Sequence, residues 1–222
     1  MCSAALAADG RVLAVAESAE GRMHSEMLTV FAEKVLQQAG FSFNDLDAVA
    51  VSKGPGSYTG LRIGVSAAKG FCYALGIPLI SVGTLHALAS GVLSKQVHVK
   101  PDVLFCPMID ARRMEVYCAF YDHKGKEVSP PSAEIISGDS FEKHLREHRV
   151  FFFGDGSPKC KAAFSGNANA VFIDNIAASA SWMASIAEQK FRKGEKEILA
   201  HFEPFYLKNF LPGKTAAERA IQ

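Results

Sequence analysis

The chain has 222 residues, of which 49% are hydrophobic and 21% are charged, and its formal net charge at pH 7 is +1. A chain of this length and composition can build one large or two small globular domains without disulfides or metals as staples. The near-zero net charge argues against a free-standing nucleic-acid-binding protein, whose basic surface would supply most of its affinity.

The first half of the sequence predicts a β-hairpin followed by a helix, a strand, a glycine loop, a helix and a strand. Asp9-Gly10 is a hairpin turn signal, because glycine tolerates the positive φ angle that tight turns need. Apolar residues at every fourth position from Met27 predict an amphipathic helix. In chain order, the predicted segments are strands Cys2–Ala7 and Arg11–Ala16, helix Met27–Ala39, strand Leu46–Val51, loop Lys53–Gly60, helix Gly60–Leu75 and strand Pro78–Val82.

The polar stretch Gly91–Asp102 separates this half from the next. We place the domain boundary there and divide the chain into residues 1–98 and 99–222. The two halves share a rough strand-then-helix order, which hints at an internal duplication. In the second half, the predicted segments are strands Val103–Ile109, Met114–Tyr121 and Val150–Phe153, helix Ala178–Lys190, a last element at Glu203–Lys208 and a mobile tail at Gly213–Gln222.

The cysteines and the start of the sequence indicate the compartment. No two of the five cysteines have C-x-x-C spacing, which argues against a zinc knuckle. Cys72, Cys106 and Cys118 lie among apolar residues, so we expect buried thiols and a reducing cytoplasm. The first residues carry no basic leader, and no apolar run approaches the ~20 residues that span a bilayer, so we expect no membrane attachment.

The loop Lys53–Gly60 is the strongest local signal. It follows a strand and opens a helix, where backbone N–H groups can hold an anion. Its spacing is neither that of a Walker A motif nor that of a dinucleotide fingerprint. Two interpretations therefore stay open, an anion-binding loop and a tight turn that the glycines and the proline shape. The candidate residues are Gly54, Pro55, Gly56, Ser57, Thr59 and Gly60.

Small residues share one face of the helix after this loop. Gly60, Gly64 and Ala68 are four apart, and glycine inside a helix costs roughly 1 kcal/mol relative to alanine. A helix accepts that cost where another helix must approach its backbone closely. The approaching helix can belong to the same fold or to another chain, and the sequence leaves both open.

Candidate catalytic and metal-binding groups are sparse. His144 and His148 are four apart but sit among charged residues, which favours a solvated helix over a metal site. The sequence has neither an H-E-x-x-H nor a G-x-S-x-G motif. Asp110, Arg112 and Arg113 follow a strand, where they can either meet a ligand or form an ion-pair cluster at the domain junction. We therefore predict no catalytic residue and no metal ligand in this chain.

Longer stretches resemble a known family. The sequence SKGPGSYTGLRIGVSAAKG at residues 52–70 resembles the signature of the TsaB (YeaZ) family, and the likeness extends from Cys2 to about Phe210. Each piece alone is weak, but their combination is specific. The other matching pieces are Met23–Glu26 with His24, Ala74–Val82, Asp110–Tyr117 with Arg112 and Arg113, Gly154–Gly156, and Pro204–Lys208; the roles of His24, Asp110, Arg112 and Arg113 in the family motif are unknown.

The resemblance implies an actin-like ATPase fold with two ribonuclease-H-like α/β domains. It also implies a non-catalytic subunit that supports its paralogue TsaD, which transfers a threonylcarbamoyl group to the adenosine beside the tRNA anticodon. A TsaE-like ATPase joins them, so ATP and metal come through partner subunits and tRNA meets only the complex. The expected interface lies on the first two helices, where two copies could also dimerise. Its candidate residues are Leu28, Phe31, Leu61, Gly64, Ala67, Ala68 and Phe71.

Two departures qualify the resemblance. TsaD-like proteins carry an H-x-x-x-H metal motif, and its two positions here are Thr84 and Leu88, so neither supplies an imidazole; His86, between them, is expected to cap or pack. Family members also begin with a strand that precedes Cys2, so we expect the natural product to begin upstream. The alternative function, an ATP-dependent transferase or kinase of the actin-like superfamily, would need phosphate loops in both domains.

Overall fold

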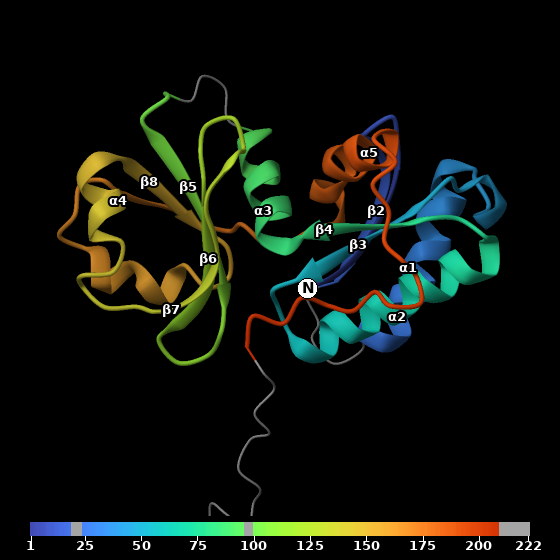
Figure 1. Ribbon diagram of the computed structural model, residues 1–222, viewed down its shortest axis with the longest axis horizontal. Helices are drawn as coiled ribbons and strands as arrows, with labels where there is room; N and C mark the ends of the chain where they lie inside the picture. The colour runs from blue at the N-terminus through green and yellow to red at the C-terminus, as the bar shows by residue number, and fades with distance from the viewer. Residues whose placement is uncertain (19–23, 96–99, 209–222) are drawn as a thin grey trace, which may run out of the picture.

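The protein consists of two α/β halves joined by helix α3 (Thr84–Leu93) (Figure 1). The structure is a computed structural model that describes residues 1–18, 24–95 and 100–208, and the side chains of residues 24–26 lie outside that description. The arrangement confirms the α/β prediction and is consistent with the expected actin-like class. Within the described residues, no helix combines the length and apolar character needed to cross a bilayer.

The first half holds two separate two-stranded sheets. Its hairpin is antiparallel, whereas the second pair of strands is parallel and runs from Val49 opposite Leu79 to Gly54 opposite Gly83. In the described part of the chain, β1 and β3 belong to separate sheets, and no strand hydrogen-bonds to both of them. The expectation of a further family strand before Cys2 stays a prediction. The elements are β1 (Cys2–Ala8), β2 (Arg11–Ser18), α1 (His24–Ala39), η1 (Phe43–Asp45), β3 (Val49–Gly54), α2 (Tyr58–Leu75) and β4 (Leu79–Gly83).

The second half is one five-stranded sheet in the order β7-β6-β5-β8-β9. Its central strand β5 is buried on both faces, so Cys106 and Met108 enter one core cluster while Phe105 enters the other. A strand that is buried on both faces has a continuous apolar sequence, and this run is why the sequence predicted β5. The elements are β5 (Val103–Asp110), β6 (Glu115–Tyr121), β7 (Glu127–Ile135), α4 (Glu142–Glu147), β8 (Arg149–Phe153), η2 (Pro158–Phe164) and β9 (Ala170–Ile173).

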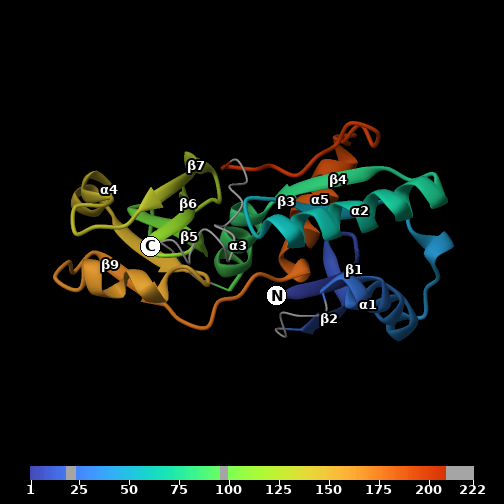
Figure 2. The same ribbon diagram turned by 90° about the horizontal axis from the view of Figure 1, so that it is seen from below.

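The chain then returns to the first half through η3 (Ala180–Met183) and α5 (Ala184–Arg192). The backbone N–H of Glu197 donates to the carbonyl of Leu79 at 2.9 Å, and Leu199 and Phe202 pack in the core of the first half. Figure 2 shows this returning segment beside β4 and α2. The division at residue 98 stays a prediction, but η3, α5 and the segment up to Phe205 contact the first half although they follow the second in sequence.

Several predicted boundaries need correction. Strand β3 begins at Val49 rather than Leu46, because β4 offers partners only from there and η1 precedes it. The predicted helix Ala178–Lys190 is a 3-10 turn followed by an α-helix that starts at Ala184. Helix α3, strands β7 and β9, and η2 had not been predicted. The predicted tail from Gly213 lies outside the described residues.

Candidate functional site

The glycine loop is packed against the chain's own C-terminal segment. Gly54 has a φ angle of +113°, and a Cβ atom built on it would lie 2.5 Å from the carbonyl oxygen of Phe205. The backbone N–H of Phe205 donates to the carbonyl of Lys53 at 2.7 Å. Only glycine fits this left-handed position, since any side chain would strain the backbone and meet Phe205. These contacts support the tight-turn interpretation of the loop.

Ser57 closes the loop and begins α2. Its hydroxyl oxygen accepts the N–H of Gly60 at 3.4 Å, and its carbonyl accepts the N–H of Leu61 at 2.9 Å. This is an N-cap, which satisfies donors that a helix start leaves open. With Ser57 as its N-cap, α2 starts at Tyr58, two residues before its predicted start at Gly60. Thr59 is exposed in the first turn of α2. In the loop itself, the peptide bond between Gly54 and Pro55 is cis.

The segment Glu203–Lys208 links the loop to the second half. The ring of Tyr206 contacts that of Tyr58 with centroids 5.0 Å apart, and Lys208 forms an ion pair with Glu115. Upstream, the ammonium group of Lys69 donates to the carbonyl of Phe202 at 3.2 Å. The predicted last element therefore has no regular secondary structure but a definite position, across the glycine loop and onto β6.

Asp110 lies at the centre of a small polar cluster at the end of β5. Its carboxylate accepts a hydrogen bond from Lys159 and another from the N–H of Arg112 at 3.0 Å. Burial raises the pKa of this carboxyl, but these bonds and the nearby positive charges outweigh burial, so its pKa is lowered overall. Lys159 also donates to the carbonyl of Glu115 at 2.6 Å. The sequence analysis did not predict a role for Lys159, because this residue follows the Gly154–Gly156 motif but belongs to no recognisable motif itself.

Of the two alternatives for Asp110, Arg112 and Arg113, a ligand contact or an ion-pair cluster, the structure shows an ion pair for Asp110 alone. Arg112 and Arg113 occupy a tight turn with φ angles of 70° and 48°, and both side chains are exposed. Among the described residues, no ion pair involves either guanidinium group. The ion pair of Asp110 is made with Lys159, and both arginine side chains are exposed to solvent.

Two glycines hold Asp155 against this cluster. A Cβ atom on Gly154 would lie 2.3 Å from the carbonyl oxygen of Met108, and one on Gly156 would lie 2.8 Å from the carbonyl carbon of Ile109. This close approach lets the carboxylate of Asp155 accept the N–H of Asp110 at 3.0 Å. The motif therefore has a structural role, since it fixes the end of β8 beside the end of β5.

The expected partner surface divides into buried and accessible residues. Phe31, Leu61 and Ala68 are buried in the chain's own core and cannot meet a partner without rearrangement. Gly64 is partly exposed, and the nearest atom to a Cβ built there is Cγ2 of Val51 at 3.8 Å, so this face of α2 lies over β3. The remaining predicted residues are half-buried; they are Leu28, Ala67 and Phe71, and the ring of Phe71 stacks on Phe43 at 5.2 Å.

The positions that correspond to the metal motif are engaged in the fold. The hydroxyl of Thr84 is 2.6 Å from that of Ser52, and Leu88 is buried in the core. His86 packs as predicted, with its ring stacked on Tyr121 at a centroid distance of 5.5 Å. Among the described residues, no group of three or more His, Cys, Asp or Glu side chains could hold a metal ion. The side chain of His24 lies outside the described residues.

The five cysteines are buried and none of them forms a disulfide in the described part of the chain; for Cys72, Cys106 and Cys118 their apolar surroundings predicted this burial. Burial raises the pKa of the Cys72 and Cys106 thiols, which leaves them protonated and unreactive at neutral pH. The two histidines that lie four residues apart, His144 and His148, also contribute to the fold. His144 stacks on Phe120 at 4.0 Å, and Nδ1 of His148 is 3.2 Å from the carbonyl oxygen of Asp102.

Comparison with known proteins places this geometry in a family. Residues 15–215 match the family model of TsaD, described as tRNA N6-adenosine threonylcarbamoyltransferase. The chain is 30% identical to tRNA threonylcarbamoyladenosine biosynthesis protein TsaB of Escherichia coli, over 96% of this chain and 94% of that protein. A 43% match to tRNA N6-adenosine threonylcarbamoyltransferase of Geobacillus kaustophilus covers 56% of this chain and 36% of that protein.

A solved structure supports the same family. The structure of YeaZ from Pseudomonas aeruginosa superposes with a TM-score of 0.77 at 26% sequence identity, over 93% of this chain and 94% of that one. The likeness therefore includes both halves and the returning segment, not the glycine loop alone. Because the matches in sequence and structure span nearly the whole chain, this protein belongs to the TsaB (YeaZ) family of tRNA threonylcarbamoyladenosine biosynthesis proteins.

Proposed function

We propose that this chain is a non-catalytic subunit that binds a TsaD-like paralogue and supports its transfer of a threonylcarbamoyl group to tRNA. The proposal rests on one observation, an exposed surface on α1 and α2 that combines small residues with large apolar ones. The match to a TsaD model and the identity with a TsaD protein support a paralogue as the partner, because relatives of one fold can pair through equivalent helices.

Helices α1 and α2 contact each other at the outer end of the first half, as Figure 1 shows. On α2, Ser66, Gly70 and Tyr73 are exposed, and Tyr73 exposes 85% of its surface. On α1, Val30 exposes 51%. Gly70 has open space where a side chain would be, so a partner helix could approach its backbone closely. We call the exposed face of α2 with Ser66, Gly70 and Tyr73, together with exposed Val30 on the neighbouring α1, the helical surface.

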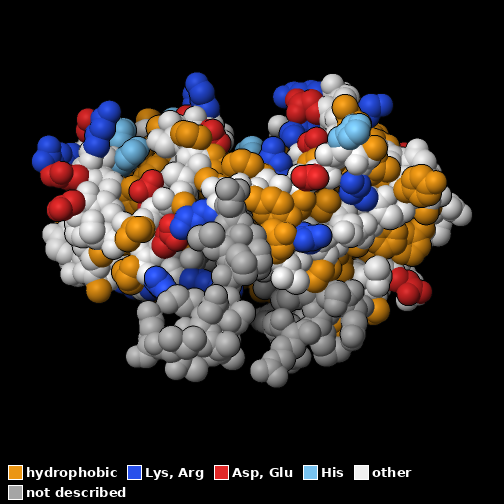
Figure 3. All heavy atoms as spheres, turned by 60° about the horizontal axis from the view of Figure 1, so that its bottom comes forward, with side chains coloured by type: hydrophobic (Ala, Val, Ile, Leu, Met, Phe, Trp, Pro, Cys, Tyr) orange, Lys and Arg blue, Asp and Glu red, His pale blue; other side chains and the backbone are white. Residues whose placement is uncertain are grey.

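The helical surface has the character of a contact site. Figure 3 turns the underside of the molecule forward and shows hydrophobic side chains spread over the first half. Large exposed apolar groups beside small residues are typical of a docking surface, and tyrosine is enriched among the residues that dominate binding energy. The same surface would pair two copies of the chain when the paralogue is absent.

The accompanying roles follow from this proposal. ATP and metal enter through partner subunits, including a TsaE-like ATPase, and tRNA meets the complex rather than this chain alone. Thr84 and Leu88 support this division, because a hydroxyl bonded to Ser52 and a buried leucine take the positions that carry histidines in TsaD-like proteins. The net charge of +1 also gives the chain little attraction for tRNA by itself.

The test is co-elution of the purified chain with its TsaD-like paralogue. We expect Gly70→Arg to abolish the complex while the variant stays folded, because its side chain would extend into open space on the helical surface. Gly64→Arg is a poorer test, since Gly64 lies over Val51 of the same chain.

The matched control is Gly138→Arg. Gly138 is exposed in the second half, and a Cβ atom there likewise meets nothing within 4 Å. This control should bind the paralogue like the unchanged chain. Equal binding by the Gly70→Arg variant would place the contact elsewhere and refute the helical surface.

A further inference from the structure

The segment Glu203–Lys208 passes from the first half to the second without regular secondary structure. We call it the strap. It follows Leu199 and Phe202, which pack against the core of the first half and so anchor the beginning of the strap. Figures 1 and 2 show the strap and α3 as separate crossings between the two halves. The strap is therefore a further connection between the halves, apart from helix α3.

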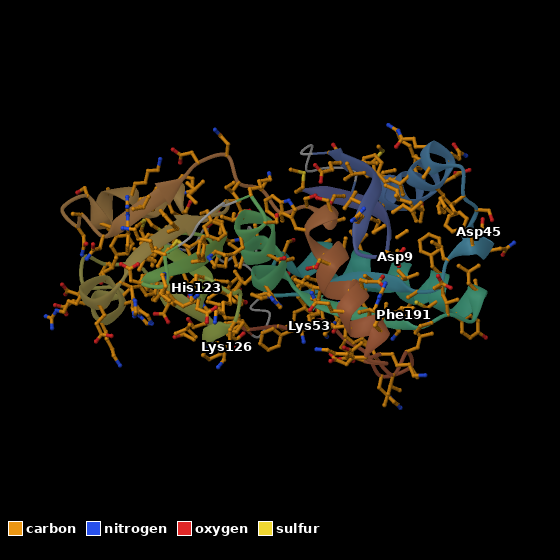
Figure 4. The ribbon with its side chains drawn as sticks, turned by 90° about the horizontal axis from the view of Figure 1, so that it is seen from above. Asp9, Asp45, Lys53, His123, Lys126 and Phe191 are labelled. Atoms are coloured by element: carbon orange, nitrogen blue, oxygen red, sulfur yellow. The ribbon has the colours of Figure 1, made fainter. Side chains whose placement is uncertain are left out.

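On the first half, the strap lies across the glycine loop. The backbone N–H of Phe205 donates to the carbonyl of Lys53 at 2.7 Å, and a Cβ atom on Gly54 would lie 2.5 Å from the carbonyl oxygen of Phe205. Beside them, the ring of Tyr206 contacts that of Tyr58 at the start of α2. Figure 4 shows Lys53 on the side of the first half that faces the second half. The strap therefore covers the glycine loop where the two halves face each other.

On the second half, an ion pair holds the strap beside the Asp110 cluster. The ammonium group of Lys208 contacts the carboxylate of Glu115, whose side chain is only 17% exposed. Among the described residues, neither group forms a second ion pair. The backbone carbonyl of Glu115 accepts a hydrogen bond from Lys159, which also pairs with Asp110. The ion pair thus fastens the strap next to the polar cluster at the end of β5.

The contacts of the strap can break without unfolding either half. None of the core clusters in the described part of the chain includes a residue of the strap, and its two aromatic residues, Phe205 and Tyr206, are both exposed. Half of the Lys208 side chain is exposed, so solvent and salt weaken its ion pair. Segments with few buried apolar contacts open locally at a lower free energy than the core does. The strap therefore has the properties of a segment that opens while both halves stay folded.

We propose that the strap is a latch that holds the two halves together and controls access to the glycine loop. In the closed state, Phe205 covers the loop while Lys208 engages Glu115. In the open state both contacts are broken, the glycine loop is uncovered, and the halves turn relative to each other about α3. Leu199 and Phe202 keep the strap attached to the first half in both states.

The latch gives the strap a consequence for binding. A ligand or a partner segment that reaches the glycine loop must first displace Phe205, and the ion pair of Lys208 opposes that displacement. The latch acts at the beginning of α2, near Tyr58, whereas the helical surface lies further along the same helix, around Gly70 and Tyr73. Either inference can therefore fail while the other holds.

Double electron–electron resonance on the full chain tests the latch. Nitroxide labels are placed on Ser66→Cys in the first half and Gly138→Cys in the second, because both positions are exposed while the native cysteines are buried. We expect Lys208→Met to lengthen and broaden the distance distribution, since it keeps a long side chain but removes the charge. Lys208→Arg keeps the charge and should give the distribution of the labelled chain without this change.

Glu115→Gln cuts the same ion pair from the other half. It should give the distribution of Lys208→Met, and the double variant should show no further change, because the two residues act through one contact. The matched control is Lys161→Met, which breaks an ion pair with Asp174 inside the second half and should leave the distribution unchanged. No change in Lys208→Met, an equal change in the control, or additive changes in the two latch variants would overturn the latch.

Amide hydrogen exchange tests whether the same ion pair governs the cover of the glycine loop. At Phe205, whose N–H bonds Lys53, exchange should quicken about tenfold or more in Lys208→Met, while exchange in β5 stays unchanged. An unchanged rate at Phe205 would refute control of access by the latch. Equal acceleration at Phe205 and throughout β5 would show global unfolding instead of local opening, and it would refute the latch as well.

Discussion

A Cβ atom built on Gly91 would lie 2.0 Å from Cδ2 of Trp182, so helix α3 rests its backbone directly on the indole ring of the returning segment. This contact joins the connecting helix to η3, which in turn contacts the hairpin strand β1. Trp182 also lies beneath the ammonium group of Lys95, 5.4 Å from the ring centroid. The relative position of the two halves therefore depends on Gly91, a glycine inside helix α3.

We expect Gly91→Ala to lower the free energy of unfolding by about 1–3 kcal/mol, because the added methyl group must displace a large ring. Alanine favours a helix over glycine by up to about 1 kcal/mol, so the clash has to exceed that gain. Urea denaturation measures the change, and the fluorescence of the single tryptophan reports displacement of the ring. Gly70→Ala, at an open helical position, is the control and should gain about 0.5–1 kcal/mol. Equal gains in both variants would contradict the contact.

Gly54→Ala should loosen the segment that crosses the glycine loop. The added Cβ atom meets the backbone oxygen of Phe205 and the φ angle of +113° disfavours any side chain, so we expect a loss of about 2–4 kcal/mol. Amide hydrogen exchange at Phe205, whose N–H bonds Lys53, should quicken more than exchange in the β5 core. Gly56→Ala is the comparison, because its Cβ atom would lie 3.9 Å from Leu61 in ordinary contact. Unchanged exchange at Phe205 in the Gly54 variant would disprove that this close contact holds the segment against the glycine loop.

The lowered pKa of Asp110 predicts a pH dependence of stability. A carboxyl with a lowered folded-state pKa stabilises the fold above its unfolded pKa of about 3.9, and this contribution is lost as pH falls through the folded value. Half of the side chain is exposed, so solvent screening limits the contribution to about 1 kcal/mol or less. Asp110→Asn should therefore reduce stability at pH 7 and flatten its decline below pH 4, as thermal unfolding across pH can measure. A variant curve parallel to that of the unchanged chain would rule out this role.

The sequence predicted the elements whose local pattern agrees with their surroundings. Strand β5 is a continuous apolar run because both of its faces are buried, and α2 ends at Gly76, whose φ angle is 68°. Strand β7 was missed because Pro130 and Pro131 interrupt it; it tolerates them as an edge strand with register shifts in its pairing. Helix α3 was missed because it is apolar nearly all round, so it has no polar face to reveal its period.

The candidate sites were predictable only in part. The spacing of Gly60, Gly64 and Ala68 predicted that another helix approaches this face closely, but the nearest atom to a Cβ built on Gly64 is Cγ2 of Val51 in strand β3, at an ordinary contact distance of 3.8 Å. Whether a helix of another chain approaches this face stays a prediction, because periodicity does not identify the neighbour. The partner of Asp110 was missed because Lys159 is 49 residues away in sequence. The groove between α3, α5 and the turn at His123–Lys126 carries no sequence motif, since its walls come from three elements that only the tertiary fold brings together.

The return of residues 180–208 to the first half also has a consequence for synthesis. A ribosome makes the strands and helices of the first half early, yet Leu199, Phe202 and Phe205 reach them only after the second half has been synthesised. Until then β4, the Lys53 carbonyl and the glycine loop stay uncovered, so the nascent first half exposes apolar surface while the second half is being translated. The first half therefore completes its folding only after the second half has left the exit tunnel.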